Sequence, residues 1–383
     1  MKKILLYTLM TVAAAGMTAC EDFLTRDTYD QIGSDEFWKS ETDLELYANG
    51  FIQKMIPGDG TITRGDIDAD YCAVDIATDL LRPDGNVSPD NQGGWTESSW
   101  TNLRRVNYML DNMHRCRGRV SDEVYNHYEG VARFWRAWFY YDKVRTFGAV
   151  PWYDFTISAS DKEALTKPRD SREYVMDKVL EDLTFASTYC LADAKYTKGS
   201  ALINKWVALA FKSRVCLYEG TFRKYHGIAD ETIDGVTISA DYFLQLAADA
   251  ASTFISESGY SLYKEGTEPY RDLFCSDDAK QEEVILARIY NFEGLNLSHN
   301  VQFKFRNMRH SATQRLVNHY LMADGSKIQD QPGYETMTYN QQFQNRDPRM
   351  AQTLMAPGYV DLNGIDEVIE DCKSYDMTGY RFI

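Results

Sequence analysis

The chain has 383 residues, of which 44% are hydrophobic and 26% are charged, and its formal net charge is −16 at pH 7. This apolar content is enough for a large core, and the length alone suggests two or three domains. Such a negative charge argues against partners that are nucleic acids, anionic lipids or polyanionic substrates, although it leaves room for a small local basic patch.

The N-terminus has the pattern of a secretory signal peptide. Lys2 and Lys3 precede an uncharged, mostly apolar stretch that ends at Met17 and is too short to span a bilayer. Small residues and then Cys20 follow, as in a bacterial lipobox, where the cysteine thiol is lipidated and the chain is cut just before it. An ordinary signal peptide with a chance cysteine is the alternative. We therefore expect removal of residues 1–19 and a membrane attachment through acyl chains on Cys20.

The next hundred residues alternate between helices and loops. Apolar spacing predicts a helix over residues 34–56, with Leu44, Leu46 and Phe51 among its anchors. Residues 57–95 are rich in Gly, Asp and Pro and predict loops, with one helical stretch from Tyr71 to Leu81. Residues 96–115 are again expected to be helical.

Three aspartates in the loop-rich segment resemble the start of a calcium loop. Asp66, Asp68 and Asp70 have the spacing of EF-hand ligands, but Tyr71 stands where that loop needs glycine and Ala77 where it needs glutamate. The EF-hand interpretation fails on both positions. A looser structural calcium site and a plain polar loop stay open, and we expect no other cofactor.

Residues 122–258 contain the strongest helical patterns. Helices are expected over about 122–146, from Asp170 onward, over about 201–219 with Gly220 at its end, and over about 241–258. Small residues recur on their apolar faces, which lets helices approach closely. Antiparallel pairs packed in this way indicate a tetratricopeptide-like array, although no repeat carries the full consensus.

Beyond residue 260 the pattern changes to loops and strand-like runs such as Val284–Ile289. No long linker or low-complexity segment separates these residues from the helices. We therefore expect residues 20–383 to form one globule, mainly α, with the helical array mainly at 122–258 and loop-rich parts at 57–95 and 260–383.

No pattern indicates catalysis. The six histidines include no HExxH spacing, no GxSxG or phosphate-binding glycine loop is present, and no two of the seven cysteines form a CxxC pair. Carboxylates are abundant, but a glycosidase pair is defined by a separation that sequence does not show. We expect a protein that is not an enzyme, and we expect no metal centre beyond the calcium hypothesis.

A series of short motifs follows in chain order. They are Asp22-Phe23-Leu24, Phe37-Trp38, Trp100 with Leu103 and Asn107, residues 132–140 with 147–151, Lys167–Ser171 with Glu181–Leu183, Leu273-Phe274 with Glu282–Ile285, Asp324-Gly325, Asn345–Met350 and Pro357-Gly358. Together these motifs resemble the SusD/RagB family of outer-membrane lipoproteins. Glu21 and Asp22 after the cysteine also resemble the surface-export signal of Bacteroidetes lipoproteins. The match departs at the end, because the family continues past Ile383 with further helices, so we expect a C-terminally truncated member.

This resemblance implies a fold and a function. The fold would be mainly α, with tetratricopeptide-like helical pairs and an irregular, loop-rich ligand-binding part. The protein would bind a glycan at the outer membrane, facing the cell exterior, and pass it to a TonB-dependent transporter of the SusC type. Two alternatives stay open, namely a peptide-binding accessory lipoprotein and a structural lid without a sugar site.

Loop aromatics are the candidate ligand-binding residues, because flat rings stack on the C–H faces of sugars. Trp95 follows two glycines in a polar loop, where nothing requires a core tryptophan. Tyr71 and Arg82 lie in the same loop-rich segment, and a guanidinium forks onto vicinal hydroxyls or a uronic acid. Tyr290 and Asn291 follow the strand-like run. Trp135, Trp138 and Trp206 lie on apolar helix stripes and are predicted to be core residues.

Overall fold

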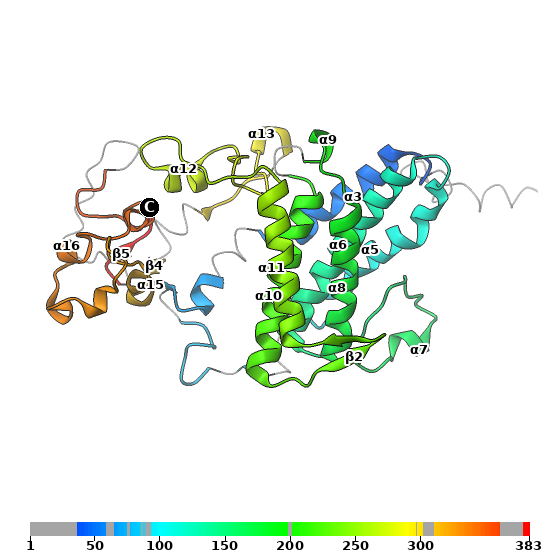
Figure 1. The fold of residues 1–383 in the computed structure, drawn as a ribbon, viewed down its shortest axis with the longest axis horizontal. Coiled ribbons are helices and arrows are strands. Elements are labelled where there is room, and N and C mark those ends of the chain that lie inside the picture. Colours follow the sequence, from blue (N-terminus) through cyan, green and yellow to red (C-terminus); the bar gives the residue numbers. More distant parts are fainter. Residues whose placement is uncertain are drawn as a thin grey trace, which may run out of the picture.

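The computed structural model describes residues 37–58, 65–74, 77–85, 87–88, 93–197, 201–295, 297–301, 310–360 and 378–383. Cys20 and the signal-peptide residues lie outside these ranges. Six long helices form the main body, and Figure 1 shows them side by side. They are α3 (Glu41–Met55), α5 (Thr101–Asn112), α6 (Asp122–Phe147), α8 (Arg172–Tyr189), α10 (Lys205–His226) and α11 (Ala240–Glu257).

The helices pack in a continuous series. α3 and α5 contact each other and α6, α6 packs against α8, α8 against α10, and α10 against α11. This is the packing of successive helical pairs that the sequence predicts, and the fold is mainly α. None of the described helices is long and apolar enough to cross a membrane.

Local signals explain where these helices begin. Ser40, Ser121, Ser171 and Ser239 each accept a hydrogen bond from a backbone N–H of the first turn, which satisfies a donor that the helix itself leaves free. The cap of α8 is therefore Ser171 and not Asp170. Gly148 ends α6 with a positive φ of 68°, a conformation that glycine adopts without steric cost.

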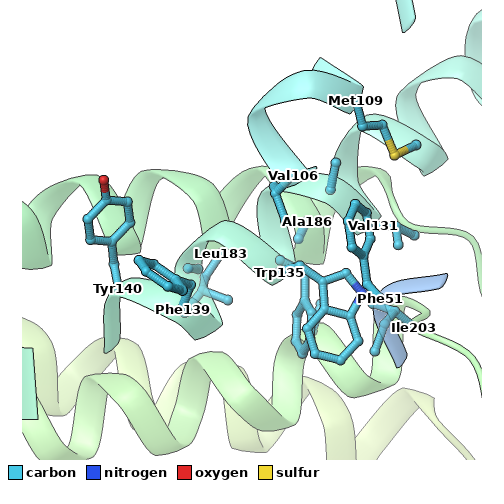
Figure 2. Close-up of a cluster of buried hydrophobic side chains, with 14 of the residues drawn as sticks. Phe51, Val106, Met109, Val131, Trp135, Phe139, Tyr140, Leu183, Ala186 and Ile203 are labelled. Atoms are coloured by element: carbon cyan, nitrogen blue, oxygen red, sulfur yellow. The ribbon is translucent and has the colours of Figure 1, made fainter. Parts of the chain in front are cut away.

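The core of the array is rich in aromatic rings. Figure 2 shows Phe51 from α3, Val106 from α5, Trp135 from α6 and Leu183 from α8 in one cluster. Trp135 is fully buried, as predicted. Trp138 and Trp206 are only half-buried, and Trp138 stacks on Phe211 with ring centroids 4.6 Å apart.

Short elements surround the array. The helices are α7 (Lys162–Leu165), α9 (Ala194–Thr197), α12 (Pro269–Cys275), α13 (Phe292–Leu295), α15 (Gln314–His319), α16 (Tyr339–Gln342) and α17 (Pro348–Ala351). The 3-10 turns are η1 (Glu97–Trp100), η2 (Met113–Cys116), η4 (Ile328–Asp330) and η5 (Tyr334–Thr336). β2 (Glu231–Ile233) and β3 (Val236–Ile238) form an antiparallel hairpin over Asp234 and Gly235.

The C-terminal elements have a small core of their own. β1 (Cys72–Ala73), β4 (Ser311–Ala312) and β5 (Tyr380–Arg381) form an antiparallel sheet in the order β1-β4-β5. The buried residues beside it are Ala312, Val317, Met350, Leu354 and Tyr380. In Figure 1 these elements lie at the opposite end of the molecule from α3 and α5.

Besides the cap of α8, four sequence-based expectations are wrong. The described residues of 71–81, which leave out 75 and 76, form no helix, because Cys72 and Ala73 pair with β4 instead. Residues 284–289 form no strand. Leu46 is 63% exposed and anchors nothing. α10 continues through Gly220, because a Cβ there would lie 2.7 Å from Leu244 Cγ, so the glycine serves the close approach of α11.

Candidate functional site

An exposed group of aromatic rings lies at the C-terminal end of α6. We call Trp95, Trp100, Phe147 and Arg169 the Trp95 cluster. The Trp95 ring meets Phe147 and Trp100 edge-on, with centroid distances of 4.9 and 5.4 Å. Such T-shaped contacts are the favoured geometry of aromatic pairs. Trp95 keeps 38% of its surface exposed, so the cluster holds the ring in place and leaves part of it open.

A buried lysine fastens the Trp95 loop to α6. Lys143 donates a hydrogen bond from Nζ to the carbonyl oxygen of Gly94 at 2.5 Å. Its ammonium also lies 5.3 Å from the Trp100 and Phe139 ring centroids, within cation–π distance. Burial lowers the pKa of Lys143. The loop carrying Trp95 is therefore held by a charge-assisted hydrogen bond as well as by ring packing.

A second loop brings Arg169 to the same ring. Asp170 anchors this loop, because its N–H donates to the Val150 carbonyl at 3.2 Å and its Oδ2 accepts from Trp152 N and Lys167 Nζ, both at 2.7 Å. The guanidinium carbon of Arg169 lies 4.6 Å from the Trp95 ring centroid. The cluster thus combines an accessible indole with an exposed cation.

The other residues predicted in the early loops lie in different surroundings. Tyr71 belongs to the C-terminal end of the molecule, where its ring meets His319 edge-on at 5.4 Å. Arg82 pairs with Asp84 at 3.1 Å and Asp79 at 3.6 Å. Among the described residues no contact joins Tyr71 or Arg82 to the Trp95 cluster. Their role in ligand binding stays a prediction.

Tyr290 and Asn291 also lie in a local setting of their own. Asn291 accepts a hydrogen bond at Oδ1 from Gly294 N at 2.7 Å, which caps the short turn of α13. The Tyr290 ring meets His299 at 5.0 Å, with the Arg288 guanidinium 5.4 Å from its centroid. The side-chain oxygen of Asn291 therefore already accepts a hydrogen bond within the protein. Ligand binding by Tyr290 and Asn291 stays a prediction.

A charged cavity lies between α5, α6 and α8, and we call it the polar cleft. Its volume is about 410 Å³. It is lined by Leu110, Asp111, Met113, Arg117, Tyr125, Glu129, Arg133, Arg136, Trp152, Asp154, Lys178, Glu181 and Asp182. This volume is in the range of small-molecule sites, about 300–1,000 Å³.

Most charges of the polar cleft are paired with one another. Buried Arg136 holds both carboxylate oxygens of Asp182 at 2.7 Å. Arg133 donates twice to Glu129 Oε1, at 3.0 and 2.7 Å. Lys178 lies 2.8 Å from Glu181. These pairs use the donors and acceptors that a ligand would need, so the cleft is less suited to binding than its polarity suggests.

A metal site or a disulfide requires a specific geometry of the metal ligands or the cysteines. Within the ranges given above, no group of three or more His, Cys, Asp and Glu side chains is placed to hold a metal ion. Asp66 and Asp68 lie in a short helical segment. Asp70, at the end of this segment, has a positive φ of 60°. The calcium hypothesis stays a prediction. The described cysteines Cys72, Cys116, Cys190, Cys216 and Cys275 are free thiols.

The sequence singles out Trp95 as a candidate but does not single out the residues that contact its ring. Phe147 stands directly before the Gly148 helix stop, and Arg169 directly before an aspartate that bonds the chain after α6. Both signals are visible in the sequence. Their meeting at Trp95 depends on contacts between residues about 50 and 70 positions apart, which the sequence pattern does not show.

Comparison with protein families gives two matches along the chain. A SusD-like family described as "Starch-binding associating with outer membrane" matches residues 22–217, and the SusD family matches residues 297–380. SusD-like protein P2 of Formosa agariphila is 27% identical over 250 residues, covering 62% of this chain and 47% of the relative. SusD-like protein P38 of the same organism is 23% identical, covering 76% and 54%. The chain thus spans about half the length of these curated relatives.

Solved structures show the same fold. A SusD-like protein and a SusD-like carbohydrate binding protein, both from Bacteroides fragilis NCTC 9343, each give a TM-score of 0.65, at 20% and 17% identity. They cover 93% and 90% of this chain, which covers 70% and 67% of theirs. A structure with xylogluco-oligosaccharide gives a TM-score of 0.54 at 16% identity, covering 85% of this chain and 61% of its own. The first family match alone spans half of the sequence, and the chain belongs to the SusD family.

Proposed function

We propose that this protein is a cell-surface glycan-binding lipoprotein that captures oligosaccharides at the Trp95 cluster. The observation that carries the proposal is the Trp95 ring, which is 38% exposed yet held by Phe147, Trp100 and the Lys143–Gly94 hydrogen bond. A ring fixed in advance loses little conformational entropy on binding. Sugar rings pack their C–H faces on such an indole, while a neighbouring guanidinium bonds their hydroxyls.

The relatives support this proposal. One solved SusD-like neighbour is named as carbohydrate binding and another contains a xylogluco-oligosaccharide. We further propose attachment to the outer membrane through lipid on Cys20, exposure to the cell exterior, and delivery of the glycan to a TonB-dependent transporter of the SusC type. Hydrolysis of the glycan would belong to other proteins.

Affinity gel electrophoresis of a soluble form that starts after Cys20 tests the capture step. Plant, host and microbial polysaccharides are cast into native gels, and reducing sugar is assayed in parallel. We expect retardation by at least one polysaccharide, its loss in Trp95→Ala, and no sugar release. Trp206→Ala is the matched control, because this half-buried tryptophan contacts Phe254 and lies outside the Trp95 cluster.

Three results would contradict the proposal. No retardation of a folded sample by any glycan would favour peptide capture or a structural lid. Retardation that survives Trp95→Ala would place the sugar elsewhere. Release of reducing sugar would indicate an enzyme.

The lipid anchor is tested separately. Cys20→Ala should abolish incorporation of labelled fatty acid and release the protein from the membrane fraction.

A further inference from the structure

We infer that the Trp95 cluster selects glycans that carry isolated carboxylate-bearing sugars, such as uronic acids, on an otherwise neutral backbone. This inference rests on the proposed function and specifies the ligand class of the same site. The charged groups at this site are Arg169 and, beneath the same loop, Lys143.

Arg169 has no carboxylate partner and no hydrogen-bond acceptor for its guanidinium among the described residues. Its contact is the Trp95 ring, 4.6 Å from the guanidinium carbon. Eight other described arginines pair with carboxylates at 2.5–3.1 Å, namely Arg82, Arg133, Arg136, Arg145, Arg172, Arg223, Arg271 and Arg349. Arg104, Arg288 and Arg346 donate to backbone carbonyls instead. In a protein with 57 acidic and 41 basic side chains, a cation left unpaired beside an exposed indole is available to a ligand.

Lys143 adds a second positive charge beneath the same loop. Its ammonium donates to the Gly94 carbonyl and lies among the Trp100, Phe139 and Phe147 rings, without a carboxylate within ion-pair distance in the described residues. Buried charge is screened less by salt than exposed charge. The Trp95 cluster therefore offers a local positive field in an acidic protein.

A carboxylate matches the donor geometry of a guanidinium. A guanidinium donates two parallel N–H groups to the two carboxylate oxygens, and this pairing is stronger than bonds to neutral hydroxyls. A pyranose packed against Trp95 carries its C-5 carboxylate at the ring edge. The Arg169 guanidinium lies over the Trp95 ring, with its carbon 4.6 Å from the indole centroid, so a carboxylate on a sugar at the open part of the indole would meet the edge of that guanidinium.

The charge of the whole chain sets an upper limit on the charge of the ligand. A net charge of −16 repels dense polyanions at long range. Exposed Glu97 in η1, two residues from Trp95, adds to that repulsion close to the site. One carboxylate at Arg169 is favoured, whereas a carboxylate on every sugar meets an unfavourable field on all sides.

Binding to glycans with and without their carboxylates tests this inference. Native glucuronoxylan, gum arabic and xanthan are compared with their carboxyl-reduced forms, and polygalacturonate serves as the dense polyanion. For at least one pair we expect the native glycan to bind the soluble protein about tenfold more tightly than its reduced form, a free-energy difference of about 1.4 kcal/mol. Polygalacturonate should bind more weakly than that glycan.

Arg169→Gln should bring the native glycan down to the affinity of its reduced form, with circular dichroism unchanged. Arg145→Gln is the matched control. This arginine lies near the same end of α6 and is also exposed, but it pairs with Asp142. Equal binding of native and reduced glycans, binding of no pair, or a preference that survives Arg169→Gln would overturn the inference. If neutral glycans still bind and Trp95→Ala abolishes that binding, glycan capture at the Trp95 cluster is supported without the preference for carboxylates. If Trp95→Ala leaves binding unchanged, glycan capture at this cluster is contradicted as well.

Discussion

The Trp95 cluster and the polar cleft are both surface regions with arginines and tryptophans, yet they differ in what is left free. In the polar cleft Arg136 is paired with Asp182, Arg133 with Glu129 and Lys178 with Glu181. In the Trp95 cluster the indole is partly exposed, and the Arg169 guanidinium lies over that ring without an ion-pair or hydrogen-bond partner among the described residues. The comparison indicates that paired charges in the cleft hold helices together, whereas unpaired groups in the cluster are available for a ligand.

The largest effect should come from breaking the buried pair of the polar cleft. Asp182→Ala leaves Arg136 buried at 7% exposure without its counter-ion, which costs about 3–5 kcal/mol of unfolding free energy. Urea unfolding followed by circular dichroism measures this loss. Replacing both partners by apolar residues (Arg136→Met with Asp182→Leu) should recover much of it. A loss below about 1 kcal/mol for the single variant would show that the pair does not stabilise the array.

Trp95→Ala should separate binding from stability. Binding of the retained glycan is expected to weaken at least tenfold, or about 1.4 kcal/mol, because the ring is the packing surface. The free energy of unfolding should fall by less than about 2 kcal/mol, since the side chain is already 38% exposed. Calorimetric titration and thermal unfolding measure the two quantities. A large stability loss with unchanged affinity would reverse the roles assigned to the two regions.

Acidification should affect the helical array more than the Trp95 cluster. Burial lowers the pKa of His127 to about 4, below the ~6.5 of an unfolded chain, so the unfolded state binds the proton more readily and stability falls as pH drops from 6.5 to 4. Burial raises the pKa of Asp177 to about 6, above ~3.9 when unfolded, so its contribution to stability rises as pH drops from 6 to 4.

The contributions of His127 and Asp177 to the pH dependence of stability have opposite signs. Asp177→Asn removes the second contribution, so the effect of His127 should become measurable. We expect this variant to lose roughly 2–3 kcal/mol between pH 6.5 and 4.5, while the parent protein changes little. Glycan affinity should stay constant between pH 8 and 5.5, because a guanidinium group is not deprotonated in proteins. Unfolding curves at each pH provide the measurement. A parent and variant with the same pH profile would refute the assignment.

The smallest effect is expected at the rim of the polar cleft. Glu181 is 61% exposed where it pairs with Lys178, and Glu181→Gln should change the free energy of unfolding by only about 0–1 kcal/mol. The same urea experiment compares it with Asp182→Ala. A loss as large as that of the buried pair would mean that exposure does not separate the two classes of ion pair.

The helices of the array were predictable because their signals are local. The apolar spacing around Trp135 acts within one or two turns, and the structure confirms it. The serine caps are equally local signals, but they were not among the predicted helix starts. Gly220 was misinterpreted as a helix end because its reason lies on another helix, where Leu244 needs the space of the missing Cβ. Residues 71–81 failed in the same way, since their partner β4 lies about 240 positions away.

Of the candidate site, the sequence pointed to one residue, Trp95, and not to the residues that contact it. Trp95 stood out because no periodic pattern required it in a core. Tyr71 and Arg82 were grouped with it by nearness in sequence, but β1 ties Tyr71 to the C-terminal sheet and two aspartates pair with Arg82. Arg169 meets Trp95 only through the Val150–Asp170 bridge, a contact that follows from the fold.

A crystal structure of the soluble protein with a retained oligosaccharide tests the central claim most directly. We predict a sugar ring packed against the Trp95 indole, within about 4 Å of its atoms, and the polar cleft with its Arg136–Asp182 pair intact. A sugar bound in the polar cleft, or at Tyr290 with Trp95 untouched, would contradict the assignment of glycan capture to the Trp95 cluster.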